Sequence, residues 1–287
     1  MLSYEEIVAV VAELAPLGLR RIRLTGGEPT IRPELDSLVR QLRAVPLVED
    51  MATLLTETGC GFLASFAHPL REAGLDLRIN MSADSLRAER IVAIARRNMA
   101  FDPVASLRVA QAAGLSPIKV NVVVMRGIND DEVLQFARLT QDHPWHVRFI
   151  ELMPVGEMQA LTWDHVVPAA EILERLAAID TLASDAGPAR GNGPAAYYRF
   201  PGAPGTVGVI TPMTHTYCGT CNRVRLTADG RLRTCLFGDH EVNLRDALRA
   251  GQPLAPLFRE ALAGKPKEHA LLQMQVGGLR ALSQVGG

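Results

Sequence analysis

Residues 16–29, PLGLRRIRLTGGEP, contain the pattern on which the fold prediction depends. A helical segment ends in Gly-Leu, an apolar strand follows at once at Arg20–Leu24, and a glycine turn comes next. Glycine suits the left-handed residue just past a helix end. The same order precedes strands expected at Leu77–Met81 and Ile118–Met125. Continuous Val, Ile and Leu strands that alternate with helices indicate a parallel β/α architecture.

The strands expected at Met51–Leu55 and Val147–Met153 complete a set of five over residues 1–155. Ser3, with Glu6 three residues later, forms a capping box, so the first helix is expected to begin there. A parallel β/α domain more usually opens on a strand than on a helix. We therefore expect that an upstream strand is missing.

The overall composition excludes several classes of partner. The chain has 287 residues, with 30 basic and 31 acidic side chains, so no global field attracts nucleic acid or an anionic membrane. No apolar run reaches the ~18 residues of a membrane span, and the first residues lack a signal-peptide pattern. A cytoplasmic protein is expected, and in that reducing compartment clustered cysteines indicate a metal site rather than disulfides.

Three of the four cysteines form the strongest motif. Cys218 and Cys221 are separated by two residues, and Cys235 follows after thirteen more. Three thiolates at this spacing suit an iron–sulfur cluster with one iron left open. His215 lies three residues before Cys218, so a Cys₃His zinc site is the alternative. The fourth cysteine, Cys60, is expected to be a small buried hydrophobe.

Basic side chains occur where a ligand could pair them. Arg223 and Arg225 fall on one strand face beside the cysteines, where they would suit a polyphosphate or form a solvated surface. Lys119 and Asn121 share one face of an apolar strand. Polar groups in a buried strand cost several kcal/mol unless they are paired. They therefore point to a ligand in a barrel lumen, unless the lysine reaches solvent at the strand end.

Residues 218–237, CGTCNRVRLTADGRLRTCLF, resemble the C-terminal cluster segment of the radical S-adenosylmethionine (SAM) GTP 3′,8-cyclases of molybdenum cofactor biosynthesis. The stretches IRLTGGEP, SPIKVNVVVMRGIND, VRFIELMP and LSQVGG resemble the same family in the same order. The resemblance implies an α/β fold, an incomplete (β/α) barrel of radical SAM type with its first strand missing and a C-terminal iron–sulfur region. It divides the chain into a partial barrel (1–180), a linker or loop (181–205), and a cluster and GTP-binding region with a Gly-Gly tail (206–287).

The family converts GTP to 3′,8-cyclo-7,8-dihydro-GTP, so the resemblance implies a lyase of molybdenum cofactor biosynthesis. The implied cofactors are a C-terminal 4Fe–4S cluster on three cysteines, together with SAM and a second 4Fe–4S cluster in the complete protein. In the implied chemistry, a 5′-deoxyadenosyl radical from SAM takes hydrogen from C3′ of GTP, and C3′ then bonds to C8. The implied partners are GTP, SAM and a downstream enzyme that makes cyclic pyranopterin monophosphate, and a homodimer is possible.

The resemblance also assigns roles to individual residues. Gly27, Ser82 and Met153 match SAM contacts, whereas Gly286 and Gly287 match a tail that enters the active site. The residues that match GTP contacts are Arg23, Lys119, Arg223 and Arg225. Those that match the ligands of the second cluster are Cys218, Cys221 and Cys235.

The sequence departs from the family at one decisive place. The family has a Cys-x₃-Cys-x₂-Cys loop after its first strand, and no cysteine precedes Cys60 here. We therefore expect a truncated or mis-started family member whose 287 residues are inactive alone. The alternatives are a non-catalytic remnant that binds GTP or zinc, and another radical SAM enzyme with an auxiliary cluster.

Overall fold

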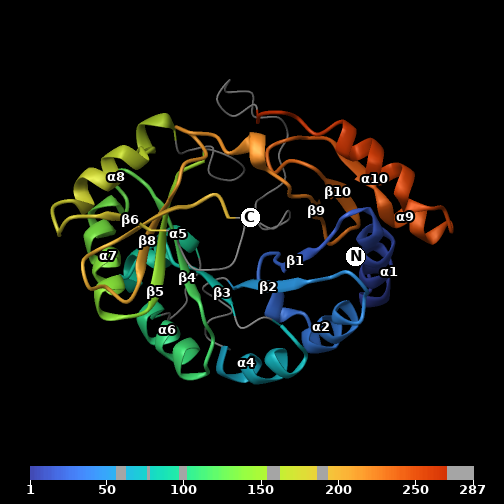
Figure 1. Ribbon diagram of the computed structural model, residues 1–287, viewed down its shortest axis with the longest axis horizontal. Helices are drawn as coiled ribbons and strands as arrows, with labels where there is room; N and C mark the ends of the chain where they lie inside the picture. The colour runs from blue at the N-terminus through green and yellow to red at the C-terminus, as the bar shows by residue number, and fades with distance from the viewer. Residues whose placement is uncertain (56–62, 76–77, 97–101, 154–161, 186–192, 270–287) are drawn as a thin grey trace.

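The computed structural model describes residues 1–55, 63–75, 78–96, 102–153, 162–185 and 193–269. Within these residues, one curved eight-stranded sheet has the order β1-β2-β3-β4-β5-β8-β7-β6, and helices cover its outer face (Figure 1). The first six strands in this order are parallel: β1 (Arg21–Leu24), β2 (Asp50–Leu55), β3 (Ile79–Ser82), β4 (Ile118–Val124), β5 (Trp145–Glu151) and β8 (Thr206–Ile210).

The helices of the barrel alternate with these strands, as the Gly-Leu pattern predicts. They are α1 (Tyr4–Leu14), α2 (Leu35–Arg43), α4 (Leu63–Glu72), α5 (Ala88–Ala95), α6 (Pro103–Ala112), α7 (Val133–Asp142) and α8 (Ala169–Leu176). The five expected strands are confirmed with shifts of a few residues at their ends. The radical SAM type of α/β architecture is therefore present, as an open sheet with β1 at one end.

The first helix begins as the capping box predicts. The Ser3 hydroxyl accepts a hydrogen bond from the Glu6 backbone N–H at 3.2 Å, and the Glu6 carboxylate accepts one from the Ser3 N–H at 2.8 Å. Gly18, just past the following turn, has φ +108°, a conformation that favours glycine. Both ends of this helical segment are therefore fixed by local sequence.

Residues 181–205, expected to be a linker or loop, contain two strands. Strand β6 (Ala183–Asp185) pairs antiparallel with β7 (Ala196–Arg199), and β7 pairs antiparallel with β8. The described part of this segment therefore extends the main sheet. Moreover β8, which we placed in the C-terminal region, is a parallel strand of the barrel.

The C-terminal region returns to the start of the chain. It contains the small antiparallel sheet of β9 (Arg225–Leu226), β10 (Arg231–Arg233) and β11 (Glu241–Asn243), followed by α9 (Leu244–Arg249) and α10 (Leu254–Ala263). Its apolar side chains form one buried cluster with Val10 and Leu14 of α1. Helices α9 and α10 consequently lie against α1, and Figure 1 shows these three helices side by side.

Candidate functional site

Three of the predicted SAM contacts lie at the same end of the parallel sheet. Gly27 follows β1 by three residues, Ser82 is the last residue of β3, and Met153 follows β5 by two residues. The carboxyl ends of parallel strands meet at one edge, which is where α/β proteins bind their ligands. Gly26 has φ +146° in the turn after β1, a conformation that a residue with a side chain rarely adopts.

Glu28, which follows the two glycines of this turn, has a local role. Its carboxylate accepts hydrogen bonds from the backbone N–H of Thr30 at 2.8 Å and from the Thr30 hydroxyl at 2.5 Å. These contacts cap the short helical turn Pro29–Ile31. The glutamate therefore fixes the shape of the glycine turn.

The middle of the sheet carries buried basic side chains. Lys119 on β4 is 8% exposed and Arg148 on β5 is 6% exposed. One Arg148 nitrogen, Nη2, donates to Asn80 Oδ1 at 2.7 Å, but its Nε has no hydrogen-bond partner among the described residues. Asn121 pairs in register with Arg148, and among the described residues its side-chain oxygen Oδ1 also has no hydrogen-bond partner. Buried polar atoms are normally satisfied, so these atoms mark a place for a ligand.

Like charges surround these groups. Burial, followed by the charges of Arg148, Arg23 and Arg78, lowers the pKa of Lys119 to about 8. Loss of hydration, followed by the charges of Arg148 and Arg223, lowers the pKa of Arg23 to about 10, although Arg23 is exposed to solvent. Cations held this close favour an anionic ligand that would offset their repulsion.

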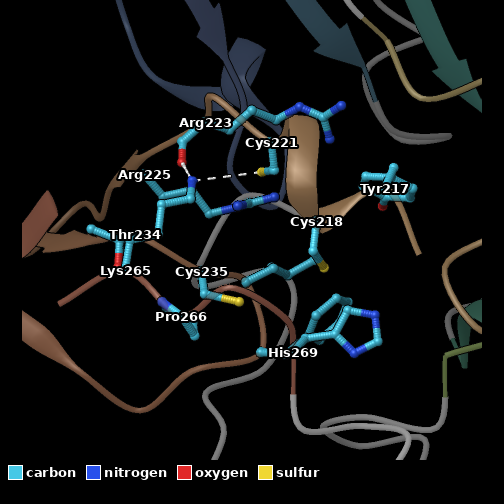
Figure 2. Close-up of a pocket in the computed structure, with 12 residues that line it drawn as sticks. Tyr217, Cys218, Cys221, Arg223, Arg225, Thr234, Cys235, Lys265, Pro266 and His269 are labelled. Atoms are coloured by element: carbon cyan, nitrogen blue, oxygen red, sulfur yellow. Dashed lines mark hydrogen bonds between the residues drawn. The ribbon is translucent and has the colours of Figure 1, made fainter. Parts of the chain in front are cut away.

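The three clustered cysteines line one pocket that is partly open to solvent (Figure 2). Cys218, Cys221 and Cys235 are free thiols. The lining also includes Tyr217, Arg223, Arg225, Lys265 and His269. The structure thus brings together the cysteines and both arginines that the sequence singled out.

Local structure explains how distant cysteines reach the same pocket. Residues Cys218–Thr220 form a single helical turn, closed by the Cys221 N–H bonded to the Cys218 carbonyl at 3.0 Å. Strand β9 then pairs antiparallel with β10, with Arg225 opposite Arg233. Cys221 precedes β9 and Cys235 follows β10, so the hairpin carries both to the same end.

Comparison with known proteins gives the family. A profile of the radical SAM superfamily matches residues 1–140, and one described as Molybdenum Cofactor Synthesis C matches residues 145–271. The GTP 3′,8-cyclase of Moorella thermoacetica is 46% identical, with 100% of this chain and 88% of that protein covered. The cyclases of Heliobacterium modesticaldum and Pelotomaculum thermopropionicum are 43% and 44% identical at the same coverage. This chain belongs to the GTP 3′,8-cyclase family.

The thiols of this cyclase family member differ in their electrostatics. Burial raises the pKa of Cys218. Burial would also raise the pKa of Cys221, but the Arg223 backbone N–H and the Lys265 charge outweigh it and lower that pKa. The thiolate is the form that binds metal, and Cys221 reaches that form more readily than Cys218.

The histidine proposed from spacing for a zinc site lies elsewhere. His215 is exposed and does not line the pocket. Across the described ranges, no three His, Cys, Asp or Glu side chains form a group that could hold one metal ion. A cluster binds its thiolates at separate iron atoms, so its ligands need not converge on a single point.

Sequence reasoning missed four residues of this region: Lys265, His269, Arg148 and Glu151. His269 is buried against the pocket, with Nε2 donating to the Pro212 carbonyl at 2.9 Å. Lysine is rare in this chain, where only Lys119, Lys265 and Lys267 occur, and that rarity is the one signal that could have drawn attention to Lys265.

Some predictions lie outside the described residues. Gly286 and Gly287, expected to enter the active site, belong to this group, and so does Cys60. In the part of the chain that is described, no helix is long and apolar enough to cross a membrane.

Proposed function

We propose that this family member binds GTP between the basic interior of the barrel and a 4Fe–4S cluster on Cys218, Cys221 and Cys235. In this proposal it acts in the conversion of GTP to 3′,8-cyclo-7,8-dihydro-GTP. The observation that carries the proposal is the pocket itself, in which three free thiols and two arginines share one lining. The product would then be the substrate of a downstream enzyme that makes cyclic pyranopterin monophosphate.

The cysteine pocket has the chemistry that an iron–sulfur cluster needs. Three sulfur donors are available, and backbone N–H groups favour the thiolate form of two of them: the Arg223 N–H that of Cys221 and the His269 N–H that of Cys218. Hydrogen bonds to sulfur are a standard feature of protein-bound clusters. When bound, such a cluster supplies an iron with one position open to a further ligand.

The arginines of the pocket would hold the triphosphate. The Arg223 guanidinium lies over the Tyr217 ring, 5.5 Å from its centroid, so that contact restrains it. Burial, followed by the Arg223 charge, lowers the pKa of Arg225. Neighbouring guanidiniums suit a polyanion because each can make paired hydrogen bonds to phosphate oxygens. Arg23 and Lys119 would extend this contact into the barrel.

The SAM assignment rests on Gly27, Ser82 and Met153 at the carboxyl ends of β1, β3 and β5. Met153 also packs with Met213, Phe237 and Cys235, so the proposed SAM and cluster sites are neighbours. The printed sequence contains no Cys-x₃-Cys-x₂-Cys segment, and no residue of it is assigned to a second cluster.

Anaerobic reconstitution followed by calorimetry with GTP tests this proposal. The reconstituted chain should hold about four irons and show an iron–sulfur spectrum. Charge-assisted hydrogen bonds contribute roughly 1.5–3 kcal/mol each, so Arg223→Ala should weaken GTP binding about tenfold or more. Arg259→Ala, on the exposed face of α10, is the matched control and should bind GTP like the wild type.

Two results would contradict the proposal. Equal GTP affinity for Arg223→Ala and the wild type would remove the arginine from the phosphate site. Tight, stoichiometric zinc that is lost in His215→Ala would replace the cluster with a zinc site.

A further inference from the structure

Lys265 makes two contacts at the cysteine pocket. It lies two residues after the end of α10, and its half-buried side chain turns back toward the cysteines. Its Nζ donates a hydrogen bond to the Arg223 carbonyl at 2.7 Å and lies 3.6 Å from Cys221 Sγ, as the dashed lines in Figure 2 show. The second contact places a positive charge directly against one of the three proposed cluster ligands.

Residues 265–269 carry Lys265 at one end, and His269 holds the other end in place. The His269 backbone N–H lies close enough to Cys218 to favour its thiolate, and the ring nitrogen Nε2 donates to the Pro212 carbonyl at 2.9 Å. The ring also packs edge-on against Phe237, with 5.0 Å between centroids. Residues 265–269 therefore bring N–H groups close to two different cysteine sulfurs. The contacts of His269 restrain the backbone that carries Lys265, so the position of the Lys265 side chain is supported by its surroundings.

A charge in this position affects the two oxidation states of a cluster unequally. Reduction adds one negative charge to the cluster and its thiolates. A nearby ammonium stabilises that added charge, and partial burial limits its screening by salt. Net charge and hydrogen bonds to sulfur are among the features that set cluster potentials.

We propose that Lys265 raises the reduction potential of the C-terminal cluster through its charged hydrogen bond to Cys221. This inference rests on the proposed function of the three cysteines as cluster ligands. Lys265 does not touch the reacting atoms in this proposal and acts only through Cys221. The competing role, a further contact to the GTP phosphates, gives a different experimental result.

A potentiometric titration of the reconstituted protein tests the proposal. Dithionite supplies the electron, and electron paramagnetic resonance (EPR) reports the reduced cluster at each potential. Lys265→Met keeps an unbranched side chain that is one atom shorter and removes the charge, so the midpoint should shift to a more negative value. Lys265→Arg keeps the charge and should lie closer to the wild type. Lys267→Met removes the same charge from an exposed position two residues away and should leave the midpoint unchanged.

Each of the other possible results has a defined interpretation. If the wild type takes up no cluster, the proposed function fails before Lys265 is tested. If it takes up a cluster and Lys265→Met has the wild-type midpoint, the proposal is wrong. Weaker GTP binding with an unchanged midpoint would make Lys265 a phosphate contact instead. Lys265→Gln, which is neutral but keeps a donor, serves if the methionine variant holds no cluster. Loss of the cluster from both neutral variants would also overturn the proposal, because Lys265 would then retain the cluster and not tune it.

Discussion

Lys119 illustrates, for a single residue, how a binding site can oppose stability. Its ammonium is 8% exposed on β4, and burial together with Arg148, Arg23 and Arg78 lowers its pKa from 10.5 to about 8. A lowered lysine pKa means that the folded protein disfavours the charged form. A bound phosphate would reverse this preference, so the same charge that destabilises the empty protein would favour the complex with GTP.

Replacing Lys119 by methionine should therefore stabilise the empty protein and weaken its complex. The pKa shift corresponds to a gain of up to about 3 kcal/mol at pH 7. Between pH 8 and 10.5 the unfolded wild type binds more protons than the folded one, so wild-type stability rises with pH there. The advantage of Lys119→Met should consequently shrink across that window. Thermal unfolding at pH 7 and pH 10 measures it, and calorimetry should show GTP affinity reduced about tenfold or more.

The matched control for this variant is Lys267→Met, which removes an exposed lysine. It should change neither stability nor GTP affinity. A Lys119→Met protein that is less stable than the wild type at pH 7, or that binds GTP equally well, would contradict this account of the basic interior.

Among the structural elements, β5 connects the barrel to the cysteine loop through its last residue. The fully buried Glu151 accepts hydrogen bonds from the backbone N–H groups of Ala169, Met213 and Thr214 at 2.9–3.0 Å. It also accepts one from the Thr214 hydroxyl at 2.6 Å. One carboxylate therefore joins the end of β5, the start of α8 and the loop that leads to Cys218.

Glu151→Gln should loosen this junction. The amide has only one acceptor oxygen, so its NH₂ group faces N–H donors and leaves at least one of them unpaired. An unsatisfied buried group costs about 1–3 kcal/mol, and urea unfolding should show a loss of about 2 kcal/mol. The reconstituted variant should also retain less iron. Glu174→Gln, exposed on α8, should behave as the wild type in both measurements. If iron content were unchanged despite the lost stability, Glu151 would stabilise the fold without helping to retain the cluster.

The elements that were predicted correctly are those that local sequence specifies. Strands β1, β3 and β4 follow Gly-Leu helix ends, β2 and β5 contain apolar runs, and α1 has its own capping box. Strands β6 and β7 were missed because β6 is short and polar, Ala183-Ser184-Asp185, and because the surrounding residues are turn-forming. A strand of three or four residues is too short to show a clear alternation of apolar and polar side chains.

The same distinction holds for the site. The cysteines, Arg223 and Arg225 lie within one short hairpin, so spacing was enough to group them. Lys265 and His269 join them only because α10 packs against β10 and α1, which the sequence does not reveal. Arg148 and Glu151 lie in an otherwise apolar strand. Their burial, which the sequence does not show, is what identifies them as residues of the site.

For the molecule as a whole, the contact of α1 with α9 and α10 joins the two parts of the proposed site. The Glu6 carboxylate pairs with Arg249 of α9 at 2.6 Å, and Glu13 accepts from the Leu254 N–H at the start of α10 at 2.9 Å. Leu14, 3% exposed, is buried in the apolar cluster between α1 and these helices. The helices next to the cysteine region therefore pack against α1, the helix that precedes β1.

Leu14→Ala should therefore destabilise the barrel and the cysteine region together. A large-to-small change in a core costs about 2–5 kcal/mol, and the cavity here would border both parts. In the reconstituted protein, circular dichroism and cluster absorption should fall in one shared transition at a lower temperature than in the wild type. Leu262→Ala, at an α10 position that is 40% exposed, should leave that temperature nearly unchanged. If cluster absorption in Leu14→Ala were lost at the wild-type temperature while the helical signal fell earlier, the cysteine region would be stable independently of α1.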